Sequence, residues 1–241
     1  MTFLGKVSSK QPDLTRKVLL ELPKKAMLNF ENPLLLSDFL THYLNQDEDV
    51  ELQVLALRGI FILLEKHGLD YPDYYKKLYH MIKPRGDHSI FNMPEKSRFL
   101  RLLDLSLRSP VLPTRLIASF LKRIARICAC HGACFAVQDI MFVVALCTNL
   151  IKRHPKCMRM LHRRAASVLS LEKDPFREDE TDPMETRALS SSLWELDTVM
   201  RQHYHSSVRL YAKVFKTDFI RKTAVAKCED FAQVDPLDVL L

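Results

Sequence analysis

Glycine is scarce in this chain, with only five among 241 residues. Sheet-containing proteins use glycine in tight turns and in phosphate-binding loops, so the shortage favours a helical protein. The sequence also has no glycine-rich phosphate loop, no G-x-S-x-G elbow and no H-E-x-x-H pair. Nothing in the chain therefore argues for an enzyme, a cofactor or a small-molecule substrate.

Long apolar runs are absent as well. The best candidate for a membrane span, residues 133–151, is interrupted by Gln138-Asp139 and by Thr148-Asn149. Since a transmembrane helix needs about 20 predominantly apolar residues, we expect a buried helix here and no membrane span. The first ten residues lack the pattern of a secretory signal, so none is expected.

The six cysteines do not form the framework of a disulfide-rich protein. Cys128, Cys130, His131 and Cys134 make the one cluster with metal-binding chemistry. Zinc sites normally take ligands from two separated pairs, whereas this spacing is cramped and lies at a predicted helix end. We interpret these cysteines as reduced and structural, and we predict no metal site.

The pattern that is present is helical. Apolar residues recur about every 3.6 positions from end to end, and alternating strand patterns are nearly absent. Prolines such as Pro33 and Pro113 are placed for first helical turns, and Gly68 for a left-handed helix end. The predicted helices span residues 13–22, 33–45, 49–67, 72–82, 95–108, 113–130, 136–153, 156–169, 184–203 and 206–216.

Helices of this length with short connections predict an all-α fold, an irregular α-solenoid of antiparallel helix pairs of the armadillo or HEAT type. No strict sequence repeat accompanies the pattern. We expect partial leading helices of the solenoid over 1–32 and a helical domain over 33–216. An acidic loop at 171–183 interrupts this domain, and 217–241 forms a tail for which disorder is one interpretation.

Basic residues gather on successive predicted helices, and the net charge is +7. Stacked helices would place them on a positive ridge for RNA phosphates or for an acidic protein segment. The alternative is that they are only the solvated faces of amphipathic helices. The contact residues expected on this ridge are Arg115, Lys122, Arg123, Arg126, Lys152 and Arg153.

Aromatic residues suggest a second kind of contact. The acidic loop carries Phe176, and a nearby predicted helix carries Trp194, the only tryptophan. Aromatic residues are enriched at the energetic centres of interfaces. Equally, Phe176 and Trp194 could pack on each other and hold the loop in place. The expected partner-binding residues are Asp174, Pro175, Phe176, Trp194, Tyr71 and Tyr74.

Several segments share their order along the chain with a known family. They are residues 55–61 (LALRGIF), 69–79 (LDYPDYYKKLY), 98–105 (RFLRLLDL), 118–126 (ASFLKRIAR), 153–157 (RHPKC), 174–176 (DPF), 181–183 (TDP), 191–196 (SSLWEL), 203–205 (HYH) and 212–215 (AKVF). In this order they resemble the carboxy-terminal half of the CCAAT-binding-factor family of nucleolar-complex-associated proteins.

The resemblance implies an armadillo-like helical scaffold in the nucleus and nucleolus, without enzymatic activity. It implies a role in small ribosomal subunit biogenesis, within the small-subunit processome. There the protein would support processing of ribosomal RNA and assembly or export of the pre-subunit. The implied partners are nucleolar protein 14 and other processome proteins, with contact to pre-ribosomal RNA left open. A helical nuclear-transport adaptor, or a general protein-interaction adaptor, is the alternative.

Overall fold

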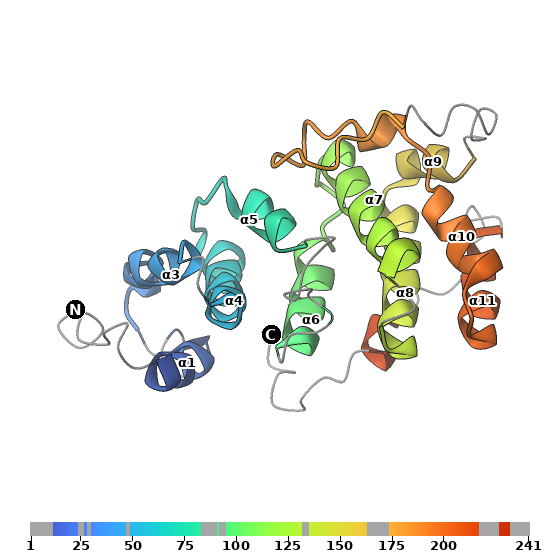
Figure 1. Ribbon diagram of the computed structural model, residues 1–241. Coiled ribbons are helices and arrows are strands. Elements are labelled where there is room, and N and C mark those ends of the chain that lie inside the picture. The colour runs from blue at the N-terminus through green and yellow to red at the C-terminus, as the bar shows by residue number, and fades with distance from the viewer. Residues whose placement is uncertain are drawn as a thin grey trace.

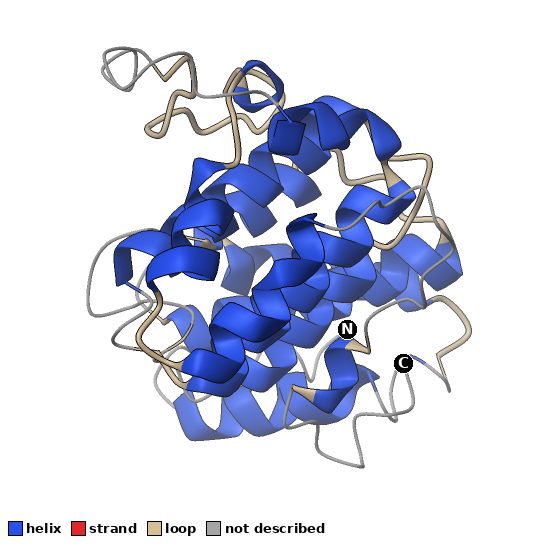
Figure 2. Cartoon of the chain, turned by 90° about the vertical axis from the view of Figure 1, so that its right-hand side faces the viewer, coloured by secondary structure: helices blue, strands red, loops and turns tan. Residues whose placement is uncertain are grey.

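The fold is helical throughout the part of the chain that the structure describes. The computed structural model describes residues 12–23, 27, 30–46, 49–82, 91, 95–131, 135–162, 174–216 and 227–231. Within these ranges every regular element is a helix and there is no strand (Figures 1 and 2). The all-α prediction is confirmed.

The α-helices follow the predicted periodicity closely over most of the chain. They are α1 (Pro12–Glu21), α3 (Ser37–Leu44), α4 (Val50–His67), α5 (Tyr74–Met81), α6 (Lys96–Ser106), α7 (Thr114–His131), α8 (Val137–Arg153), α9 (Met158–His162), α10 (Trp194–Gln202) and α11 (Ser206–Ala212). Short 3₁₀ turns lie at Pro33–Leu36, Pro155–Cys157, Ala188–Ser190, Lys213–Lys216 and Cys228–Asp230.

The helices pack in succession, as a solenoid-like row. Helix α4 packs against α1, α3 and α6; further along, α7 packs against α8 and α10, and α11 against α8 and α10. Figure 1 shows this progression from the amino-terminal helices on one side to α10 and α11 on the other. One continuous cluster of buried apolar side chains runs through the row, from Leu19 to Cys228.

Helix α4 shows how local sequence sets these elements. The Asp49 side chain accepts hydrogen bonds from the backbone N–H groups of Glu51 and Leu52 and so caps the first turn. Gly68 ends the helix with φ 66°, the left-handed conformation predicted for it. At Gly59, an added Cβ would lie 2.8 Å from the Leu40 side chain on α3, so glycine allows the two helices to approach closely.

The apolar segment expected as a buried helix is α8. Ile140, Leu146 and Ile151 are fully buried in it, which confirms that prediction. Among the described helices, none combines the length and apolarity needed to cross a bilayer.

The prediction of one helix over 184–203 is wrong in its first half. Residues 183–193 form turns and a single 3₁₀ turn, and α10 begins only at Trp194. The predicted helix 156–169 is a 3₁₀ turn followed by α9, with 163–169 outside the described residues. Helix 206–216 is α11 continued by a 3₁₀ turn. Of the predicted tail, residues 227–231 are described, and their 3₁₀ turn packs against α8.

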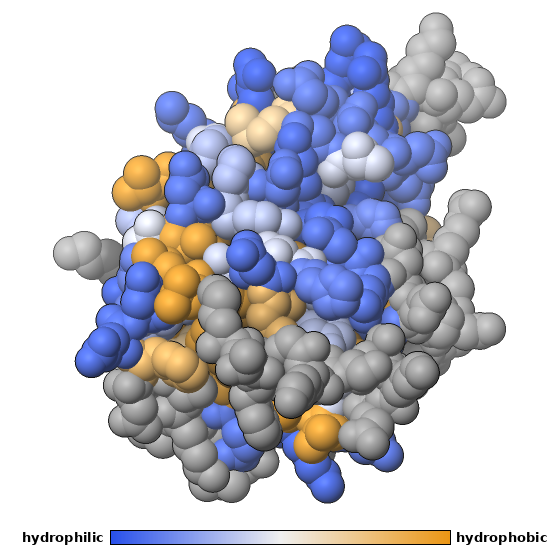
Figure 3. Space-filling model, turned by 90° about the vertical axis from the view of Figure 1, so that its left-hand side faces the viewer, coloured by the Kyte–Doolittle hydropathy of each residue, from blue (hydrophilic) through white to orange (hydrophobic). Residues whose placement is uncertain are grey.

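The amino-terminal side of the row leaves some apolar residues uncovered by the described chain. Leu14 on α1 is 45% exposed and Leu35, just before α3, is 53% exposed. Figure 3 shows this side of the molecule, with apolar side chains lying among polar ones. Single exposed apolar residues are normal on protein surfaces and indicate no function by themselves.

Candidate partner-binding site

One stripe of helix α7 holds an irregular segment, residues 174–193, against the row. Ser119, Lys122, Arg123 and Arg126 recur at positions i, i+3, i+4 and i+7, so their side chains leave the helix on one face. In Figure 1 the segment, drawn in orange, passes over one end of α7. All four side chains bond to this segment or to the start of α10.

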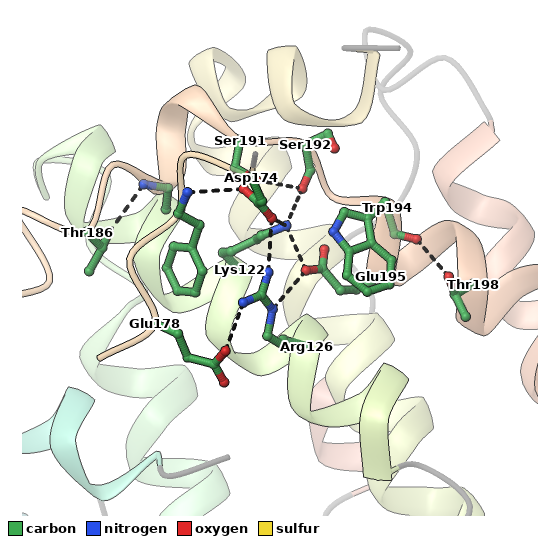
Figure 4. A network of polar contacts seen from close by, with 12 residues as sticks. Lys122, Arg126, Asp174, Glu178, Thr186, Ser191, Ser192, Trp194, Glu195 and Thr198 are labelled. Atoms are coloured by element: carbon green, nitrogen blue, oxygen red, sulfur yellow. Dashed lines mark hydrogen bonds and ion pairs between the residues drawn. The ribbon is translucent and has the colours of Figure 1, made fainter. Parts of the chain in front are cut away.

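Lys122 is the centre of the contact. Its side chain is 0% exposed, and its Nζ lies 2.6 Å from Glu195 Oε1 and 3.0 Å from Asp174 Oδ2. It also donates a hydrogen bond of 2.7 Å to the Ser192 carbonyl oxygen. A buried ammonium needs such partners, because desolvation of an unpaired charge would cost several kcal/mol (Figure 4).

Arg126 joins the same carboxylates from one turn further along α7. Its Nε lies 3.2 Å from Glu195 Oε1 and its Nη2 3.0 Å from Asp174 Oδ2. Its Nη1 lies 3.0 Å from Glu178 Oε2. Two cations therefore share three carboxylates, and we call Lys122, Arg126, Asp174, Glu178 and Glu195 the ion network (Figure 4).

Arg123 binds backbone rather than carboxylates. Its guanidinium donates to the carbonyl oxygens of Tyr79 at 3.0 Å, Glu178 at 2.8 Å and Glu180 at 3.3 Å. Its Cζ lies 3.5 Å from the centre of the Tyr79 ring, a cation–π contact. Arg123 thus connects the end of α5 to the irregular segment 174–193, which is rich in carboxylates and is called the acidic segment from here on.

Hydroxyl groups complete the attachment nearer the start of α7. The buried Ser119 Oγ hydrogen-bonds to the Pro183 carbonyl oxygen and to Thr186 Oγ1. The Arg177 N–H donates to the Thr186 carbonyl oxygen at 2.8 Å, which closes the segment on itself. These bonds use carbonyl groups that an α-helix would have kept for its own ladder.

The pKa values of the two central carboxyl groups, Glu195 and Asp174, are shifted in opposite directions. Burial raises the pKa of Glu195, and the attraction of Lys122 offsets only part of this effect. For Asp174 burial also acts to raise the pKa, but hydrogen bonds from Ser191 and from the Phe176 N–H, together with Lys122, outweigh it. The pKa of Asp174 is therefore lowered.

The expectation of an exposed basic ridge is wrong for Lys122, Arg123 and Arg126. Lys122 and Arg123 are buried and the side chain of Arg126 is 16% exposed, because the acidic segment folds over them. On α8, Lys152 and Arg153 are half-buried, and Arg153 Nη1 lies 3.7 Å from Asp104 Oδ1. Of the six expected residues, Arg115 alone is exposed.

The expected partner-binding residues also divide by exposure. Phe176 is 7% exposed and Tyr74 is 2% exposed, with the Tyr74 hydroxyl bonded to Ser106 Oγ. Lys122 Nζ lies 6.0 Å from the centre of the Phe176 ring and 5.4 Å from that of Trp194, and Arg126 Cζ lies 4.9 Å from the Phe176 ring. Both aromatic side chains therefore pack against the cations of the ion network. Pro175 is exposed, and Asp174, Trp194 and Tyr71 are half-buried.

A cavity of about 510 Å³ lies beside the ion network. Its cationic lining comes from Arg115 on α7, Arg159 on α9 and Arg187, the residue just before the 3₁₀ turn Ala188–Ser190. Sequence analysis predicted neither Arg159 nor Arg187 as a site residue. In the sequence Arg159 is one basic residue among many, and no motif marks Arg187. Arg187 has φ 59°, which a sequence pattern does not reveal.

The structure describes only part of the cysteine cluster. Cys128 is buried in the core, which raises its pKa, and Cys130 is exposed. Cys134 lies outside the described residues. Within the described part of the chain, no three His, Cys, Asp or Glu residues are grouped to hold a metal ion.

The fold and the site together define an all-helical, solenoid-like protein in which one helix holds an acidic segment through buried ion pairs. Comparison with known families is more specific. The CBF/Mak21 family matches residues 53–212, more than half of the chain, and the chain belongs to this family.

Curated relatives agree with the family assignment. The chain is 40% identical over 213 residues to the nucleolar complex protein 4 homolog of Mus musculus, covering 88% of this chain and 39% of that protein. It is 37% identical over 235 residues to nucleolar complex protein 4 of Saccharomyces cerevisiae, covering 90% and 41% respectively. The chain thus spans about two fifths of the length of these relatives, whose names agree with the expected nucleolar location.

Proposed function

We propose that this protein is a non-catalytic scaffold in ribosome biogenesis, acting on the small subunit. The observation that carries the proposal is the match to nucleolar complex protein 4 relatives over most of this chain. The finer parts of the proposal rest on the resemblance described above. They are specificity for the small subunit, processing of ribosomal RNA, and assembly or export of the pre-subunit. The stable partner on this proposal is nucleolar protein 14, within the small-subunit processome.

The geometry supports a scaffold rather than a catalyst. In the described residues the densest group of ionisable side chains is the ion network, whose Lys122 and Glu195 are both 0% exposed. Groups that neutralise each other away from solvent fix structure and leave no place for a substrate. A row of packed helices also presents a long, stiff surface, which suits the binding of other macromolecules.

Depletion of the protein from cells, together with affinity purification of a tagged copy, would test the proposal. Cells depleted of the full-length protein should accumulate unprocessed precursors of small-subunit RNA while large-subunit precursors mature normally. The tagged protein should co-purify with nucleolar protein 14 and with early small-subunit particles. Equal defects in both subunits would contradict the small-subunit role, and absence from pre-ribosomal particles would overturn the scaffold proposal. Saturable binding to a nuclear-transport GTPase would favour the adaptor alternative instead.

A further inference from the structure

The arginine-lined cavity differs from the ion network in how its cations are partnered. Arg115, Arg159 and Arg187 come from three separate elements and line one cavity of about 510 Å³. All three residues are exposed, and none has an ion pair with a carboxylate in the described part of the chain. Glu185, also exposed, is the one carboxylate in the lining that the structure describes.

The rest of the lining is built rather than accidental. Ser119 and Thr186 are each 1% exposed and bonded to each other, and they fix this part of the cavity to α7. Apolar surface comes from Pro175, Met184, Ala188 and Leu189. The volume falls within the usual range of ligand sites, roughly 300–1,000 Å³.

The backbone conformation at Arg187 is a further sign of a functional site. Its φ of 59° is a left-handed conformation that costs a residue with a side chain about 1 kcal/mol or more. It is held by bonds on both sides, from the Ala188 N–H to Thr186 Oγ1 and from the Ser190 N–H to the Arg187 carbonyl oxygen. Strain of this kind gathers at functional sites, where the surrounding structure keeps a side chain in place.

We propose that this cavity binds carboxylate side chains of an acidic, aliphatic segment of a partner protein. The inference rests on the proposed scaffold function and names the chemistry of one contact. Guanidinium groups bind carboxylates through paired hydrogen bonds, and the apolar lining suits aliphatic neighbours of the acidic residue. No aromatic side chain lines the cavity in the described residues, so the base stacking typical of single-stranded nucleic-acid sites has no platform here.

Fluorescence anisotropy on the full chain tests this proposal. The probe is a labelled, end-blocked ten-residue peptide of alternating Glu and Leu, compared with the same peptide carrying Gln in place of Glu. The test variant is Arg115→Ala/Arg159→Ala/Arg187→Ala, in which alanine retains the Cβ at position 187. The control variant, Lys66→Ala/Lys213→Ala/Lys216→Ala, loses the same charge from exposed sites outside the cavity lining.

The Glu peptide should bind the unchanged chain and the lysine control alike, and the arginine variant about tenfold or more weakly. The Gln peptide should bind none of them comparably. Equal losses in the two variants, or equal binding of both peptides, would overturn the proposal. A decauridylate RNA whose binding depends on the three arginines, while the Glu peptide's does not, would replace it with a nucleic-acid site.

The two proposals can fail separately. If the Glu peptide does not bind but the tagged protein still isolates small-subunit particles, only the cavity assignment is lost. If the peptide binds as expected and the protein never joins those particles, the cavity stands and the scaffold proposal is lost.

Discussion

Two groups of cations lie around helix α7, and they differ in what surrounds them. Lys122, Arg123 and Arg126 are covered by the acidic segment, and each is bonded to carboxylates or carbonyl oxygens. The three cavity arginines lie in or near the same region but are exposed, without ion pairs among the described residues. The comparison teaches that cations near one helix can differ in role: those on one face of α7 are neutralised by the segment that covers them, whereas Arg115, Arg159 and Arg187, from three separate elements, remain exposed around a cavity.

The largest effect should come from the centre of the ion network. Lys122→Met keeps most of the apolar stem but removes the ammonium, so that among the described residues Arg126 is the one cation left to Glu195 and Asp174. We expect a loss of about 3 kcal/mol or more in the free energy of unfolding, measured by urea denaturation. Arg115→Met on the same helix is the control and should be nearly neutral. Similar losses for both would remove the distinction between the two groups.

A smaller effect is expected at Arg123. Arg123→Lys retains the charge but loses the planar group that reaches three carbonyl oxygens and stacks on Tyr79. Stability should fall by about 1–3 kcal/mol, and proteolysis within residues 174–190 should become faster. Arg201→Lys, at an exposed pair with Asp197, is the matched control and should change neither measurement. Unchanged proteolysis in Arg123→Lys would mean that other contacts hold the segment.

Acid should weaken the network through Asp174. Because its pKa in the folded state is lowered, ionised Asp174 contributes stability above its ordinary pKa of 3.8, and this is lost as the pH falls through the folded value. Asp174→Asn should cost about 1–2 kcal/mol at pH 7 and flatten the acid side of the stability curve. Glu195, with its raised pKa, acts with the opposite sign in both proteins. Because it shares Lys122 and Arg126 with Asp174, the difference between the two curves reports ionised Asp174 together with its coupling to Glu195. Parallel curves would exclude a role for ionised Asp174.

The smallest effect is expected where the cations are exposed. The triple alanine variant of Arg115, Arg159 and Arg187 should change the free energy of unfolding by no more than about 0.5 kcal/mol. The same urea measurement gives the answer. A loss above about 2 kcal/mol would place the cavity arginines with the structural group and so abolish the contrast.

Much of the fold follows from local signals. The span of α4 was predictable because its cap and its end depend on Asp49 and Gly68, residues that act on their immediate neighbours. Helices α6, α7 and α8 were predictable for the same reason, since the apolar period is intrinsic to each segment. Family and location followed from ordered motifs.

What failed depended on contacts far apart in the sequence. Residues 184–193 have helical periodicity, yet Ser119 and Lys122 bond to the carbonyl groups of Pro183 and Ser192, and these tertiary bonds replace the helix. The basic stripe on α7 looked solvent-facing because nothing in its own sequence indicates that an acidic segment about 50–70 positions later will cover it. Burial of Lys122 was therefore not predictable from α7 alone.

The hydrogen bonds of Arg123 to main-chain oxygens have a consequence for sequence variation within the family. A guanidinium that binds main-chain oxygens is indifferent to which side chains those residues carry. Substitutions at Glu180 should leave this contact intact, even though they remove the local bonds from the Thr181 and Asp182 N–H groups to the Glu180 carboxylate. Replacement of the arginine removes the contact itself, so variation should concentrate on one side of it. An alignment of the family would reveal that asymmetry.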